Sequence, residues 1–402
     1  MPGSQDESRS SEPVEITVLV TESEANTAEF WDASIAAASA KVPGVTVKKI
    51  VSIGDEYPGQ LRASGQLPDV LGQVNVDDLH DTLMPYDEAW LEENFLFWES
   101  GVYSDGNVYT PSTGTQIVPL VFYNKTIFAD NGISVPKTWS EFLDVVAKLR
   151  AAGVTPIEMA GGEGWAADIG MVGAVTTDVL GKDPEWIQKL KAGEAKFSDA
   201  DFVGAVQKMI DLVEAGAYDP AALSADYSAA NQNFLDGKSG MYPMGSWFIG
   251  KGYLTDEQAE NIGVFLWPSD NGTAYLPTVA GGTFAVNKES PNAEVAMEWA
   301  KAWATNQESY KPLIENDAAF ILLKNASLAD LGVDVTPLYM EGYELATGDA
   351  ATSVPSFRWT GGKNAIPSTV ADGFMGMAQA VFTNSDAAAL CADLDAQWAA
   401  AQ

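Results

Sequence analysis

The chain is poor in the residues on which metal sites, disulfides and nucleophilic catalysis usually depend. Cys391 is the only cysteine and His80 the only histidine among 402 residues. No disulfide can form within the chain, and a structural zinc site of the usual Cys/His type cannot be built. His80 lies in a polar, helical-looking stretch and is expected on the surface, whereas Cys391 lies in an alanine-rich helix and is expected in the core. We predict no cofactor and no metal.

Basic residues are also scarce. Lys and Arg number 22 against 56 acidic residues, a formal charge of −34. Phosphate backbones are bound through basic patches, so this balance argues against a nucleic-acid partner, and it disfavours adsorption to an anionic membrane. No run of 18 apolar residues is present, so the sequence predicts no membrane span. A chain of this length with 46% apolar residues can bury a large core and is expected to form two domains.

The first hundred residues alternate between strand and helix signals. Strands are predicted at 14–20, 45–53 and 67–74, with a helix ending near residue 40 and a mostly helical stretch over 76–101. This alternation is typical of parallel strands with crossover helices, and ligands of such sheets bind beyond the carboxyl ends of the strands. Glu22, Gln73 and Asn75 are therefore predicted near a binding site.

The segment 106–157 is the most informative part of the sequence. An apolar strand, Ile117 to Tyr123, runs directly into a short helix. Thr138 and Glu141 then have the spacing of a capping box, and apolar residues at helical spacing follow until Gly153. A further strand is predicted over 154–159. The segment is thus an α/β unit of strand, two helices and strand.

Three blocks of sequence, in order, resemble the carbohydrate-binding group of extracellular solute-binding proteins of bacterial ABC importers, which includes maltose-binding protein. One block departs from the group's pattern at Pro111, which follows the tyrosine by two residues rather than three, and another at Gly240, which replaces an alanine. The matching residues are Asp105, Gly106, Tyr109, Tyr123, Asn124, Lys125, Pro136, Thr138, Trp139 and Glu141, then the block Phe234 to Trp247, and earlier the block Gly65 to Val70.

The resemblance implies an α/β fold of periplasmic-binding-protein type II. In this fold two lobes are joined by crossing strands, and the ligand lies in the cleft between them. We expect a disordered linker with a cloning remnant at 1–13, a first lobe at 14–120 plus 279–330, and a second lobe at 121–278 plus 331–402. The crossings are predicted at Ile117–Tyr123, at Tyr275–Val286 and near 325–336.

Aromatic residues in loops are the main candidates for binding. A pyranose presents apolar C–H faces and a ring of hydroxyls, so its site needs flat aromatic surfaces and polar side chains. Most of the twelve tryptophans, including Trp299 and Trp303, are expected in the core, but three lie in glycine-rich loops. The predicted ligand-binding set is Glu22, Gln73, Asn75, Thr115, Trp165, Asp168, Ser246, Trp247, Arg358 and Trp359.

The sequence is compatible with three functions. The resemblance implies a non-catalytic protein that closes on an oligosaccharide and delivers it to a membrane permease, as a monomer. A glycoside hydrolase with two of the many carboxylates is the alternative. A binder of ions, amino acids or polyamines with the same fold is disfavoured by the aromatic loops.

The resemblance also implies where the protein acts. Gram-positive members of the group are extracellular and are anchored to the membrane by a lipid on a cysteine just upstream of a polar linker. Residues 1–13 form such a polar stretch and contain no cysteine. We expect the native protein to be held at the cell surface by this kind of anchor.

Overall fold

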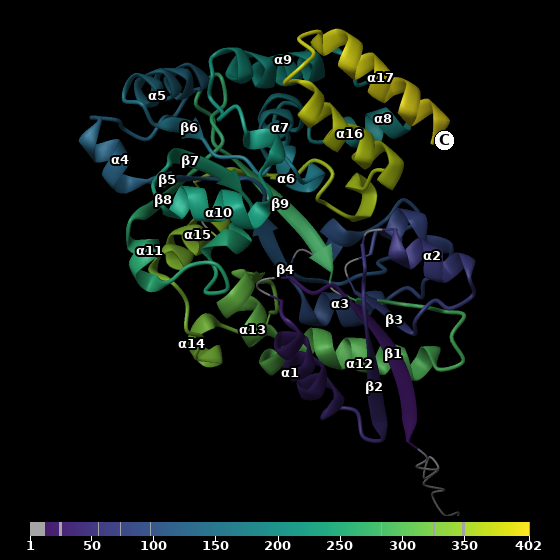
Figure 1. Cartoon of the computed structure of the whole chain (residues 1–402). Helices are drawn as coiled ribbons and strands as arrows, with labels where there is room; N and C mark the ends of the chain where they lie inside the picture. Colours follow the sequence, from purple (N-terminus) through teal and green to yellow (C-terminus); the bar gives the residue numbers. More distant parts are fainter. Residues whose placement is uncertain are drawn as a thin grey trace, which may run out of the picture.

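The computed structural model describes residues 13–23, 26–54, 56–72, 74–96, 98–282, 284–324, 326–347 and 350–401. Three four-stranded sheets organise the chain. Figure 1 shows one sheet in the upper part of the molecule, one in the lower part, and strands β4 and β9 running between them. The helices cover the two outer sheets, so the chain forms two α/β lobes.

The first lobe is built on the sheet β10-β3-β1-β2. Its strands are β1 Val14–Val20, β2 Val45–Val51, β3 Val70–Gly72 and β10 Phe284–Val286. The first three strands are parallel, with Val14 opposite Val45, and β10 is antiparallel. Parallel neighbours require crossover connections, which α1 (Ala28–Ser39) and α2 (Tyr57–Ala63) provide. The predicted strands are confirmed, although β2 and β3 are shorter than expected.

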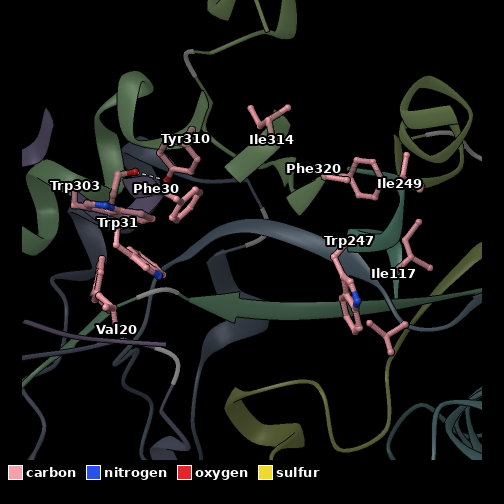
Figure 2. Packing of buried hydrophobic residues seen from close by; sticks show 14 of the residues in the cluster. Val20, Phe30, Trp31, Ile117, Trp247, Ile249, Trp303, Tyr310, Ile314 and Phe320 are labelled. Carbon is pink, nitrogen blue, oxygen red and sulfur yellow. Dashed lines mark hydrogen bonds between the residues drawn. The ribbon is translucent and has the colours of Figure 1, made fainter. Parts of the chain in front are cut away.

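Helices α12 (Ala293–Thr305) and α13 (Gln307–Asp317) pack against α1 and complete this lobe. Trp299 and Trp303 are fully buried there, and their indole N–H groups donate to Ser39 Oγ at 3.0 Å and Ser34 Oγ at 2.7 Å. Figure 2 shows Trp31, Trp303 and Tyr310 gathered in this part of the core. The prediction that these tryptophans are packing residues is confirmed.

The second lobe is built on the sheet β6-β7-β5-β8. Its strands are β5 Leu120–Asn124, β6 Thr155–Ile157, β7 Ser239–Met244 and β8 Ile262–Leu266. After β5 come α4 (Lys125–Asp130) and α5 (Trp139–Ala151), and α5 begins with the predicted capping box. Strand β6 is shorter than the predicted 154–159. The remaining helices of this lobe are α6 Gly164–Ala167, α7 Ile169–Val175, α8 Trp186–Lys191, α9 Ala200–Glu214, α10 Tyr227–Leu235, α11 Asp256–Glu260, α15 Pro337–Thr347, α16 Ser368–Ala380 and α17 Ala387–Ala400.

The middle sheet, β11-β4-β9-β12, joins the lobes. Strand β4 (Ser112–Ile117) leads through Val118 and a cis Pro119 into β5, and β9 (Tyr275–Gly282) leads back to β10. The two predicted crossings are therefore present, and each is divided between two sheets. The edges of the middle sheet are β11 Phe320–Ile321 and β12 Thr352–Pro355.

The third predicted crossing, near 325–336, is made by loop segments and the short helix α14 (Leu328–Leu331) rather than by a strand. The interval 326–336 carries the chain from α13, beside α1, to α15, beside α11 and β8. The later strand that joins the middle sheet is β12, which has four residues and was not predicted. The described residues of the stretch 76–101 contain one α-helix, α3 (Glu88–Asn94), and 3₁₀ turns at Val76–Asp78, His80–Thr82 and Trp98–Gly101, so this stretch is less helical than expected.

The single histidine and cysteine lie where the sequence places them. His80 is exposed, and Cys391 is fully buried in α17. Burial raises the pKa of the Cys391 thiol to about 12, so almost no thiolate exists near neutral pH. Within the described ranges no helix is long and apolar enough to cross a membrane.

Candidate functional site

A cavity of about 670 Å³ lies between the two lobes. The first lobe contributes residues beyond the carboxyl ends of β1, β2 and β3, where a parallel sheet is expected to bind ligands. The second lobe contributes Arg358 and the first two turns of α16. The lining residues that carry polar side chains are Thr21, Ser52, Glu56, Asn75, Asp78, Arg358, Ser368, Thr369 and Asp372.

The three loop tryptophans lie together, and two of them contact Arg358 of the cavity lining, although none of the three is among the described residues that line the cavity. Trp165 is on the one-turn helix α6, Trp247 on the 3₁₀ turn Ser246–Ile249, and Trp359 in the turn after β12. Ring centroids are 5.4 Å apart for Trp247 and Trp359, 6.1 Å for Trp165 and Trp247, and 6.4 Å for Trp165 and Trp359. Segments far apart in the sequence thus build one aromatic cluster, which we call the tryptophan cluster.

Hydrogen bonds hold two members of the tryptophan cluster. Trp247 Nε1 donates to the Tyr227 hydroxyl at 3.0 Å, and Trp165 Nε1 donates to Glu163 Oε2 at 2.8 Å. The other oxygen of Glu163 accepts from the backbone N–H of Tyr227 at 2.7 Å. Trp359 Nε1 is buried and has no hydrogen-bond partner among the described residues. Such a donor is costly to bury unless a partner reaches it.

Trp247 is far more buried than a loop residue is expected to be. Its side chain is only 8% exposed, whereas Trp165 and Trp359 are partly exposed. Figure 2 shows Trp247 close to Ile117 and Ile249, at the end of the core nearest the crossing strands. Its ring therefore contributes to the packing between β4 and the second lobe, independently of any role in ligand binding.

Arg358 connects the cavity to the tryptophan cluster. Its Nε and Nη2 both donate to the carboxylate of Asp168, with Nη2 at 2.9 Å from Oδ1. Nη2 also donates to the carbonyl oxygen of Trp165 at 3.1 Å, and the guanidinium carbon lies 4.5 Å from the Trp359 ring centroid. Asp168 is 0% exposed. Burial raises the pKa of Asp168, while the neighbouring guanidinium favours the ionised carboxylate.

The predicted residues of the first lobe do not all face the cavity. Asn75 lines it. Glu22 follows β1, but its carboxylate pairs with Lys49 Nζ at 3.2 Å, and Lys49 also pairs with Asp32 at 2.7 Å. Gln73 lies outside the described residues.

Thr115 and Ser246 take part in the junction between the lobes. Thr115 Oγ1 donates to the carbonyl oxygen of Val279 at 3.1 Å, across the pair β4–β9. Ser246 is fully buried, and its Oγ accepts from the backbone N–H of Ile117 at 3.1 Å. In this structure both hydroxyls bind backbone groups of the crossing strands rather than lining the cavity.

Sequence reasoning missed the wall formed by α16. Ser368, Asp372 and Met375 line the cavity and are spaced by four and then three residues, which places them on one helical face. The polar residues at 368 and 372 interrupt the apolar pattern of this helix, and that interruption is the signal that could have found them. Thr21, Ser52 and Asp78 were missed on the opposite wall.

The described residues contain no group of three or more His, Cys, Asp or Glu side chains placed to hold a metal. One carboxylate stands out near the crossing strands. Asp317 ends α13, and Gln116 Nε2 lies 3.3 Å from its Oδ2. Burial raises the pKa of Asp317 to about 7, which brings its titration into the physiological range.

Comparison with known proteins adds a family match and curated relatives. The family model described as bacterial extracellular solute-binding protein matches residues 24–310. A multiple sugar-binding protein of Streptococcus mutans is 26% identical over 267 residues, which cover 62% of this chain and 61% of that protein. The osmoprotective compounds-binding protein GgtB of Synechocystis is 25% identical over 227 residues, 53% of this chain and 51% of that protein. The chain thus spans about half to three fifths of these relatives' length.

Solved structures share the whole fold at low sequence identity. A chitin oligosaccharide binding protein superposes with a TM-score of 0.80 at 21% identity, covering 96% of this chain and 99% of the other. The protein RafE in complex with raffinose superposes with a TM-score of 0.71 at 19% identity, covering 96% and 98%. At this identity the likeness shows the fold, which is the predicted type II arrangement of two α/β lobes joined by crossing strands.

Proposed function

The chain belongs to the bacterial extracellular solute-binding protein family, and on that premise we propose that it captures an oligosaccharide between its lobes and delivers it to an ABC importer. The observation that carries the proposal is the interlobe cavity of about 670 Å³, whose lining residue Arg358 contacts Trp165 and Trp359 of the tryptophan cluster. Pockets of this size suit small ligands, and aromatic faces beside polar side chains suit sugars. The names of the multiple sugar-binding protein, the chitin oligosaccharide binding protein and the RafE–raffinose complex support the same class of ligand.

The proposal includes the arrangement of the chain. The first lobe comprises residues 14–120 plus 279–330, and the second lobe comprises residues 121–278 plus 331–402. The permease subunits of the importer are the partners of the loaded protein, which acts as a monomer. In the cell it is held outside the membrane by a lipid anchor.

The contacts in the structure assign different roles to the residues of the ligand-binding set. Asn75, Arg358 and the polar residues of α16 contact the sugar directly, because they line the cavity. Trp165 and Trp359 supply the stacking surfaces, since they are the more exposed members of the tryptophan cluster. Glu22, Gln73, Thr115, Asp168, Ser246 and Trp247 stay in the predicted set.

A thermal-shift screen against plant, host and storage oligosaccharides tests the function. A sugar that binds only the native state raises the melting temperature, by an amount that grows with its concentration above the dissociation constant. The hits are then incubated with the protein and chromatographed. Intact sugar is expected. Cleavage products would favour the glycoside hydrolase, and a screen without hits would contradict sugar capture. Calorimetry on a hit is expected to give the same affinity with and without chelator.

A further inference from the structure

Arg358 is held in an unusual conformation between the cavity and the tryptophan cluster. It is one of two non-glycine residues with positive φ in the described chain, at 58°. This region is sparsely populated by side chains larger than asparagine, so surrounding contacts must hold the residue there. The contacts with Asp168, the carbonyl of Trp165 and the ring of Trp359 do so.

A count of donors shows what Arg358 has left for a ligand. A guanidinium carries five N–H groups. Nε uses one on Asp168, and Nη2 uses two, on Asp168 and on the carbonyl of Trp165. No described residue accepts from the two N–H groups of Nη1. The Arg358 side chain is 10% exposed and lines the interlobe cavity, and these two donors are the ones left for a ligand there.

The charge of Arg358 is already cancelled. Asp168 is fully buried and contacts the guanidinium through both carboxylate oxygens, so the pair is electrically neutral from the cavity side. The other ionisable residues that line the cavity are Glu56 and Asp78 from the first lobe and Asp372 from α16. All three are acidic. The cavity therefore offers fixed hydrogen-bond donors without an uncompensated positive charge.

We propose that the Asp168–Arg358 pair sets the ligand selectivity of the site. Asp168 is a positioning residue that aims the two Nη1 donors of Arg358 at adjacent hydroxyls of an uncharged sugar and, by cancelling the guanidinium charge, excludes sugars that carry a carboxylate. This inference rests on the proposed function and narrows its substrate class to neutral oligosaccharides. A uronate that enters the cavity loses the hydration of its carboxylate and lies near the carboxylates of Glu56, Asp78 and Asp372. None of the described lining residues offers an uncompensated positive charge that would offset this loss.

The test uses three neutral disaccharides, cellobiose, maltose and α-1,4-galactobiose, each beside the form in which C6 is oxidised to a uronic acid. Calorimetry gives the affinity for every member, and the quantity compared is the ratio of the neutral to the anionic affinity within each pair. For any pair that binds, we expect the native protein to favour the neutral member at least tenfold. Equal or tighter binding of the uronate would overturn the inference and leave sugar capture standing. Failure of all six to bind, together with a thermal-shift screen without hits, would contradict both.

Three substitutions separate selectivity from general damage. Asp168→Asn keeps the volume but uncovers the guanidinium charge, so the neutral-to-anionic ratio should fall at least tenfold. Arg358→Gln removes the donors, so neutral affinity should fall while uronate affinity does not rise. Asp178→Asn is the matched control: it breaks another buried ion pair of the second lobe, with Lys208 at 2.7 Å, and it should lower stability without changing the ratio.

Two further measurements keep the inference testable if Asp168→Asn fails to fold. Glu56 is exposed and lines the cavity, so Glu56→Gln should lower the ratio at least twofold in a stable protein. Indole fluorescence of sugar-free Arg358→Gln should shift, because the guanidinium lies over the Trp359 ring. An unchanged ratio in Glu56→Gln, together with unchanged fluorescence in Arg358→Gln, would refute the role of the pair.

Discussion

Replacing Trp247 with alanine separates the two roles that its position implies. The side chain is 8% exposed, contacts the rings of Trp165 and Trp359, and donates to the Tyr227 hydroxyl at 3.0 Å. Truncation of a buried tryptophan costs about 3–5 kcal/mol through lost burial and the cavity left behind. The lost hydrogen bond adds about 1 kcal/mol. We therefore expect Trp247→Ala to lower the free energy of unfolding by about 4–6 kcal/mol, a large fraction of a typical domain's stability.

Urea unfolding followed by far-ultraviolet circular dichroism measures this loss, with the slope of the transition checked against the parent. Trp247→Phe is the control, because it keeps most of the ring area and removes the N–H donor, so it should cost far less. Trp165→Ala, at a more exposed ring, should change stability less and weaken sugar binding by about 1.5–3 kcal/mol. An unfolding midpoint for Trp247→Ala within error of the parent would refute the packing argument and restore the sequence-based prediction, in which Trp247 serves binding alone.

Three further predictions concern the same region. Gly245→Ala should destabilise the protein by about 1–3 kcal/mol or more, measured by urea unfolding, because an added Cβ would lie 2.0 Å from the Trp247 ring. Asp317 holds its proton up to about pH 7 in the folded protein and only up to about pH 4 in the unfolded chain, so it contributes stability at low pH that is lost as the pH rises from 4 to 7. Asp317→Asn should remove this part of the pH dependence of the free energy of unfolding. An unchanged pH dependence would contradict the argument. Small-angle scattering should show a smaller radius of gyration when a sugar hit binds, since a ligand that contacts both lobes favours the closed state; an unchanged radius at saturation would count against closure.

Local patterns in the sequence determined much of the fold. Strand β1, the capping box that begins α5 and the core positions of Trp299 and Trp303 were predictable, because each depends on neighbours within a few residues or on one helical face. The three ordered blocks of family sequence added the two-lobed arrangement, since they mark units whose order along the chain defines the crossings. Boundaries were less predictable: hydrophobicity continues past the last hydrogen-bonded residue of a strand, so β2, β3 and β6 are shorter than expected.

The site depended on contacts that no local pattern encodes. Glu22 had the predicted place after β1, but only the fold brings Lys49 of the neighbouring parallel strand to its carboxylate. Asp168 and Arg358 are 190 residues apart, and their pairing turns two separate hydroxyl-binding candidates into one neutral unit. The sequence by itself determined the family, the strand and helix order and the loops that carry the tryptophans. The tertiary structure decided which side chains face the cavity and which are taken up by partners, because burial and ion pairing arise between segments distant in the chain.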